Sequence, residues 1–388
     1  MKSLLPFGWS APRISFHASA CAFALALVPG LTGCAEGLRV RQVEAAQEKP
    51  ANVLLFFRVS SAAAEGGAGA GGKESGVAGL QESAFTVKED ERVVGPGVDR
   101  VIVNPDLRAT QATLVLLDLG GRPSAEELDA LSGAVTELVE KLGPGKRLGL
   151  YALDGAEQPM PLAPFGASQD ALRAAAAKIP SYKTRDPSLD LNGGYVAALR
   201  VLKQAIPANN GPRIANLVLI ARGPDRAARI DARAVKAELK KVDFDVSRFA
   251  LGFGPEAPTA KLDTFTDGAP VVAATPTALR DAADGLAAAL DERGRSFYLL
   301  SYCTPARGGE HRLKLEVSRE KENAKGKPEV ETGSLQYSFK ADGFGAGCTP
   351  LVPDGWKNET PAVVTTTAAH AERRGGAKPS LAGAIPAH

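Results

Sequence analysis

The middle of the chain alternates between short apolar runs and amphipathic segments. The apolar runs predict buried strands at residues 113–117, 147–153, 214–220, 246–253 and 269–273. Between them, apolar positions recur with helical spacing and predict helices at residues 124–142, 168–179, 193–205, 231–242 and 275–293. Such regular alternation predicts an α/β fold with a mostly parallel sheet and helices on both faces. The predicted α/β domain spans residues 111–294.

Strand-like segments flank this domain on both sides. Branched and aromatic residues predict strands at residues 52–59, 84–91, 100–103, 296–302, 311–317 and 334–339. We expect the two β regions, residues 51–110 and 295–348, to pair into one accessory β-sandwich. The lysine- and glutamate-rich residues 319–331 predict a solvated hairpin loop. Residues 349–388 are rich in Pro, Thr, Ala and Gly without periodicity, which predicts a disordered tail.

The N-terminus is predicted to be an export signal. Lys2 and Arg13 precede an apolar run at residues 20–28, which has the length of a signal-peptide core and is too short to span a bilayer as a helix. The run leads into Leu31-Thr-Gly-Cys34, which resembles the lipobox of bacterial lipoproteins. An ordinary secretory signal with an incidental cysteine is the alternative interpretation.

The lipobox resemblance implies that residues 1–33 are a cleaved lipoprotein signal peptide and that Cys34 is acylated. Residues 34–50 are polar and predict a tether between the lipid and the first strand. Ala35 follows the cysteine, and by the sorting rules of Gram-negative lipoproteins the absence of Asp there favours the outer membrane. The expected location is therefore the cell envelope, with lipid anchoring.

The remaining cysteines agree with export. Once Cys21 has left with the signal and Cys34 has been acylated, Cys303 and Cys348 are the two thiols that remain. A pair of cysteines in an oxidising compartment predicts a disulfide. Two unpaired buried thiols are the alternative.

Composition excludes several classes of function. The 46 basic and 44 acidic residues give a formal net charge of +2, and loss of the signal with Lys2 and Arg13 would bring it to zero, which gives no surface for nucleic acid. The chain has four histidines, of which one, His311, lies in the predicted folded body. A histidine triad or a multi-histidine metal site is therefore excluded, and we expect no cofactor.

Two glycine-rich segments fall short of nucleotide-binding motifs. Residues 67–74 resemble a phosphate loop, but Glu74 stands where Ser or Thr would hold magnesium. Residues 252–257 resemble a dinucleotide fingerprint, but Pro255 interrupts the required turn. An acid–base pair remains a possible catalytic site, drawn from four acidic residues near predicted loops: Asp154, Asp186, Asp190 and Asp225.

Three segments of the α/β domain resemble one family. Residues 113–122 (TLVLLDLGGR) resemble the first strand and metal loop of a von Willebrand factor type A domain. Residues 188–199 (SLDLNGGYVAAL) resemble its second loop and following helix, and residues 217–223 (LVLIARG) resemble its fourth-strand motif. The resemblance implies a Rossmann-like fold with its site where the sheet strands end. It covers about residues 113–293.

The family's metal-binding residues are largely replaced. Its members hold Mg²⁺ with Asp-x-Ser-x-Ser, a Thr and an Asp. Asp118 is kept here, but Gly120 and Arg122 replace the two serines, Leu189 stands near the Thr position beside a shifted Ser188, and Arg222 replaces the second Asp. We expect that no metal binds and that Arg222 or Arg122 pairs with Asp118. Alternatively, both arginines point to solvent and Asp118 caps the next turn.

These observations predict a non-catalytic, metal-independent module that binds a protein partner or acts as a scaffold in the cell envelope. The partner would contact a group of loop residues, here called the rim: Asp118, Gly120, Arg122, Ser188, Leu189, Asp190, Arg222 and Asp225. The alternatives are an envelope hydrolase that uses loop carboxylates, a metal-dependent adhesin if the site still binds Mg²⁺, and a structural component without a discrete site.

Overall fold

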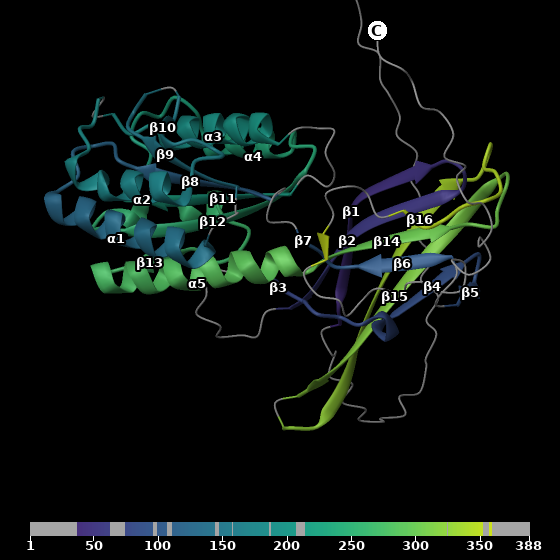
Figure 1. The fold of residues 1–388 in the computed structure, drawn as a ribbon. Helices are drawn as coiled ribbons and strands as arrows, with labels where there is room; N and C mark the ends of the chain where they lie inside the picture. The colour runs from purple at the N-terminus through teal and green to yellow at the C-terminus, as the bar shows by residue number, and fades with distance from the viewer. Residues whose placement is uncertain are drawn as a thin grey trace, which may run out of the picture. The chain divides into compact units, whose positions relative to one another are not determined.

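A computed structural model provides the fold (Figure 1). The described residues all belong to one compact unit, Glu36–His388. They are residues 37–62, 74–95, 99–106, 111–143, 147–156, 158–185, 188–206, 214–323, 325–351 and 357–358. The predicted signal peptide and Cys34 lie outside them. Within the described residues, no helix is both long enough and apolar enough to cross a membrane.

The α/β domain is built on a six-stranded sheet with the order β10-β9-β8-β11-β12-β13. Neighbouring strands are parallel except β10, which runs antiparallel to β9. The strands are β8 (Ala112–Asp118), β9 (Arg147–Leu153), β10 (Met160–Ala163), β11 (Ile214–Ala221), β12 (Asp245–Phe253) and β13 (Val271–Ala273). The predicted α/β fold class is therefore confirmed.

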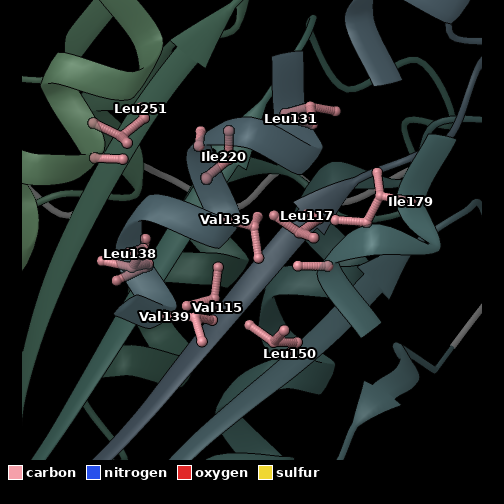
Figure 2. Packing of buried hydrophobic residues seen from close by; sticks show 14 of the residues in the cluster. Val115, Leu117, Leu131, Val135, Leu138, Val139, Leu150, Ile179, Ile220 and Leu251 are labelled. Atoms are coloured by element: carbon pink, nitrogen blue, oxygen red, sulfur yellow. The ribbon is translucent and has the colours of Figure 1, made fainter. Parts of the chain in front are cut away.

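Among the described residues, five α-helices cover the two faces of this sheet. They are α1 (Ala125–Leu142), α2 (Gln169–Ala177), α3 (Leu191–Ala205), α4 (Ala232–Leu239) and α5 (Pro276–Arg295). Successive side chains of a strand point to opposite faces, so Val115 and Leu117 of β8 pack with α1, α2 and α5. Figure 2 shows this core, with Val135 of α1 among its members. Leu114 and Leu116 pack on the other face with α3 and α4.

Local sequence signals explain where the helices begin. The Ser124 hydroxyl accepts from the Glu127 backbone N–H at 3.1 Å, and the Glu127 carboxylate accepts from the Ser124 N–H at 2.8 Å. These two hydrogen bonds form a capping box at the start of α1. Thr275 caps α5, and Pro276 occupies its first turn.

The flanking strands form two antiparallel sheets. One has the order β1-β2-β14-β6, with β3 also paired to β2, and the other has the order β16-β15-β4-β5. The first sheet contains β1 (Arg39–Glu48), β2 (Asn52–Ala62), β3 (Glu74–Gly76), β6 (Arg100–Val103) and β14 (Phe297–Cys303). The second contains β4 (Phe85–Glu89), β5 (Arg92–Val94), β15 (Glu310–Glu322) and β16 (Pro328–Lys340).

Both sheets contribute side chains to one apolar core. Phe57 and Tyr298 come from the first sheet, and Phe85 and Leu315 from the second. The two β regions on either side of the α/β domain therefore form a single β-sandwich, as the sequence predicts. Cys303 at the end of β14 forms the predicted disulfide with Cys348, with a Cα–Cα distance of 5.7 Å.

Three boundaries differ from the sequence predictions. The predicted tether is wrong over residues 39–48, which form β1, because the backbone of this polar segment pairs with apolar β2. The predicted loop at residues 319–331 is mostly strand, because β15 and β16 pair as far as Glu322 and Pro328. In the predicted tail, β17 (Lys357–Asn358) pairs with β7 (Pro105–Asp106), and most of the remaining tail lies outside the described residues.

A buried ion cluster lies where the sandwich meets the α/β domain. Asp245, at the start of β12, accepts hydrogen bonds from Arg41 of β1 and Arg293 of α5. Arg293 is 3% exposed, and its guanidinium also lies 5.1 Å from the centroid of the Phe297 ring. Burial opposes ionisation of Asp245, but the charges of Arg293 and Arg41 hold its pKa below the usual value. The Asp245 carboxylate therefore joins residues from three elements.

We expect the substitution Asp245→Asn to lower the free energy of unfolding by about 3 to 5 kcal/mol, because it leaves the buried charge of Arg293 uncompensated. Urea denaturation at neutral pH measures this change. The loss should shrink as the pH falls through the lowered pKa of Asp245, because protonation then removes the same charge from the natural protein.

Asp284→Asn is the matched control, since Asp284 is half-exposed and pairs with exposed Lys141 at 3.0 Å. Its effect should stay within about 1 kcal/mol. Equal losses from the two substitutions would show that the Asp245 cluster does not stabilise the junction.

Candidate functional site

The carboxyl ends of two central strands lie side by side at one edge of the α/β sheet. Asp118 is the last residue of β8, and Arg222 directly follows β11. These two strands are neighbours in the sheet. From β8 the chain continues to β9 on one side, whereas from β11 it continues to β12 on the other. The strand order therefore reverses between these two strands, which is where open α/β sheets place their ligand sites.

Asp118 is fully buried at this point. One carboxylate oxygen accepts from the Gly120 backbone N–H at 3.1 Å, and the other accepts from the Arg222 backbone N–H at 2.9 Å. Burial raises the pKa of Asp118, while the Arg222 charge and the two backbone N–H groups oppose that rise. Both oxygens of the side chain are thus already engaged within the protein.

The Arg222 guanidinium connects three parts of the site. Its Nε donates to the Asp118 carbonyl at 3.0 Å, its Nη2 donates to the Gly120 carbonyl, and its Nη1 donates to the Glu127 carboxylate at 3.1 Å. Nη2 also lies 3.9 Å from the Asp118 carboxylate. Arg222 is 8% exposed, so its charge is fixed in place. We call Asp118, Arg222 and Glu127 the arginine clamp.

Of the two arginines that the sequence offered as partners of Asp118, Arg222 is the one that pairs with it. Arg122 is exposed, and its backbone has a positive φ of 64°. The alternative in which both arginines point to solvent does not describe Arg222. Asp118 does contact the turn that follows it, through the Gly120 N–H, so that part of the alternative holds.

Leu189 lies against Gly120, the position at which the family resemblance implies a serine. A Cβ atom placed on Gly120 would lie 3.1 Å from the Leu189 side chain and 3.4 Å from the Ser188 carbonyl. A side chain at position 120 would therefore require Leu189 to move. Leu189 is 4% exposed, and its side chain makes this part of the site apolar.

Asp190 and Asp225 hold the neighbouring loops together. Asp190 caps α3 by accepting from the Gly193 N–H at 2.9 Å, and it lies 3.6 Å from Arg229. Asp225 accepts from the Leu191 N–H at 3.1 Å and from the Asn192 amide at 2.8 Å. Burial raises the pKa of Asp225, and the charge of nearby Asp190 adds to that rise. Both acids thus support the loop after β11.

A divalent cation does not fit this donor set. Mg²⁺ requires several free oxygen ligands in near-octahedral geometry. Here both Asp118 oxygens accept backbone N–H groups, Gly120 has no side chain, and Leu189 is apolar. The Arg222 guanidinium adds a positive charge next to the carboxylate.

Asp154, a further carboxylate considered for acid–base chemistry, is also engaged. Asp154, at the end of β9, accepts from Tyr182 at 2.7 Å and from Arg185 at 2.7 Å. Burial opposes ionisation of Asp154, but hydrogen bonds from Arg185 and Tyr182 hold its pKa below the usual value. Asp186 lies outside the described residues.

Sequence reasoning missed two residues at the site. The spacing of Ser124 and Glu127 is typical of a capping box, but the second contact of Glu127, with Arg222, depends on where β11 lies. Thr184 donates to the Leu119 carbonyl at 2.7 Å and so ties the loop before α3 to the loop after β8. Nothing in its local sequence marks Thr184.

No family model matches the chain, and no curated protein matches it. Its fold is similar to that of several solved structures. A von Willebrand factor type A protein from Catenulispora acidiphila has 11% identity and a TM-score of 0.40, over 78% of this chain and 73% of that one. A mutant form of the PilB minor pilin from Streptococcus sanguinis has 9% identity and a TM-score of 0.37, over 66% of this chain and 79% of that one.

Proximal thread matrix protein 1 from the mussel byssus has 14% identity and a TM-score of 0.36, over 46% of this chain. The similar region spans 48% of that protein, about half of its length. At these low sequence identities, the comparisons show a similarity of fold alone.

We expect Arg222→Met to lower the free energy of unfolding by about 3 to 5 kcal/mol at neutral pH, because it leaves the Asp118 carboxylate buried without a cation. The loss should shrink as the pH falls, because a protonated Asp118 needs no compensating charge, and burial already raises the pKa of this group. Urea denaturation at several pH values measures both effects.

Arg122→Met is the matched control, because Arg122 is an exposed arginine on the neighbouring loop between β8 and α1. Its effect should stay within about 0.5 kcal/mol. A loss at Arg222 that is equally small, or that does not depend on pH, would contradict a charge-compensating role.

Proposed function

We propose that this protein is an exported, lipid-anchored module of the cell envelope that binds a protein partner through the rim. Binding requires no metal ion, and the protein is not an enzyme. The export signal and the acylation of Cys34 rest on the N-terminal sequence, in which the apolar run leads into Leu31-Thr-Gly-Cys34. The proposed location is the outer membrane.

The arginine clamp is the observation that carries this proposal. It places a fixed, buried positive charge at the switch point of the sheet, where the family resemblance implies a bound cation. The Nε, Nη1 and Nη2 of this guanidinium all donate hydrogen bonds within the protein. Its positive charge therefore stays in place whatever ions the solvent contains. It supports a rim whose shape is independent of divalent cations.

The acidic groups at the rim favour binding over hydrolysis. A general acid or base must reach the substrate proton, yet Asp118 is 0% exposed. Glu127 is held by both Arg222 and the start of α1. Asp190 and Asp225 accept hydrogen bonds from the backbone of α3. These carboxylates stabilise the loops and are not poised for proton transfer.

Charged side chains around the clamp are available for recognition. Arg122 is exposed, and Arg226 and Glu256 pair with each other while 55% and 52% of their side chains remain exposed. Arg229 is 45% exposed beside Asp190. Exposed charges of this kind set the specificity and association rate of a protein complex more than its affinity. We therefore expect partner binding that weakens with increasing salt.

Site-specific photo-crosslinking in cells tests this proposal. A benzophenone amino acid is placed at Arg122 on the rim, or at Lys240 as the control. Lys240 is also exposed and basic, but it follows α4 and precedes β12, so it lies at the opposite, amino edge of the sheet. We expect a discrete cross-linked protein from position 122 and none from position 240, with a yield that a metal chelator does not change.

Equal cross-linking from both positions would contradict a rim-specific interface. Loss of the product on chelation would instead favour the metal-dependent adhesin.

A further inference from the structure

A cavity of about 330 Å³ opens in the β-sandwich, away from the rim. Its walls include Phe85 of β4, Val93 and Val94 of β5, and Arg100 of β6. β5 is an edge strand of one sheet, and β6 is an edge strand of the other. The cavity therefore lies where the edges of the two sheets meet. Its volume is within the range of pockets that hold small organic ligands.

The walls of this cavity are mainly apolar. Phe85 is 3% exposed and belongs to the core of the sandwich. Val93 is 66% exposed, which makes it the most exposed of the large apolar side chains in the described residues. Exposed apolar surface beside a hollow favours an apolar ligand.

Arg100 lines the cavity as a poorly compensated cation. It is 3% exposed. Its Nη1 donates to the Val94 carbonyl at 3.3 Å and its Nη2 donates to Glu82 at 3.4 Å, both longer than typical hydrogen bonds. Its Nε has no hydrogen-bond partner among the described residues. A buried guanidinium with a free donor favours a further anionic partner.

We propose that this cavity binds a medium-chain aliphatic carboxylate. The hydrocarbon chain packs against Phe85, Val93 and Val94, and the carboxylate accepts two hydrogen bonds from the Nε and Nη2 of Arg100. A carboxylate and a guanidinium match in this paired geometry. A small number of polar groups in a mainly apolar pocket fixes the orientation of the ligand.

Glu82 competes with the ligand for Arg100. Of the described residues that line the cavity, Glu82 is the one with an acidic side chain. This side chain is 23% exposed, and its hydrogen bond from the Arg100 Nη2 is long. It can therefore move into solvent when a ligand carboxylate takes its place. Removing the Glu82 carboxylate should strengthen ligand binding, whereas removing the Arg100 charge should weaken it.

Isothermal titration calorimetry of the mature chain with decanoate, below its micelle concentration, tests this site. Decylamine has the same hydrocarbon chain with a positive head group. We expect saturable binding of one decanoate and no binding of decylamine. Arg100→Met should weaken decanoate binding at least tenfold, and Glu82→Ala should strengthen it several-fold.

Arg122→Met is the control, because it removes an equal charge from the exposed rim, and it should leave decanoate affinity unchanged. Thermal unfolding reports whether Arg100→Met folds. If it does not fold, the decylamine comparison and Glu82→Ala still decide the question. Equal binding of decanoate and decylamine, or no gain with Glu82→Ala, would overturn the proposal. Binding of a peptide with a free C-terminal carboxylate but not of decanoate would also overturn it.

Discussion

The buried contact between Arg222 and Asp118 is the constraint around which the carboxyl edge of the α/β sheet is organised. Asp118 ends a strand whose residues are all buried, so its charge enters the interior together with β8. Isolated buried carboxylates are strongly destabilising, and Arg222 provides the compensating charge. Because the same guanidinium also holds the Gly120 carbonyl and Glu127, it fixes the loop after β8 and the start of α1.

The pattern of apolar residues predicts the parts of the fold that hydrophobic burial determines. β8 and β11 are mostly apolar and buried along their whole length because helices cover both faces of the sheet. β1 could not be found in this way, since most of its side chains are polar and it is held by backbone pairing with β2. β5 has three residues, too few to show a period. Backbone pairing leaves no local pattern of apolar residues, even where a strand pairs with its neighbour in the chain, as β1 and β5 do.

The sequence predicts the candidate site only in part, because several of its contacts join segments that are far apart in the chain. The family resemblance identified Asp118 and Arg222, because both lie at the ends of recognisable strands. Which arginine reaches Asp118 depends on the path of the backbone, and the positive φ at Arg122 lies in a turn that the sequence alone does not resolve. The second contact of Glu127 required knowing that β11 lies beside β8. The cavity around Arg100 likewise depends on how two sheet edges meet.

Calorimetric titration of Mg²⁺ and Mn²⁺ into the protein is the most direct test of whether the Arg222 charge stands in place of a metal ion. We expect no saturable binding of either ion by the natural protein or by the Asp118→Ala variant. Saturable binding with micromolar affinity, lost in Asp118→Ala, would contradict it. That result would mean that the guanidinium leaves the carboxylate to admit a cation.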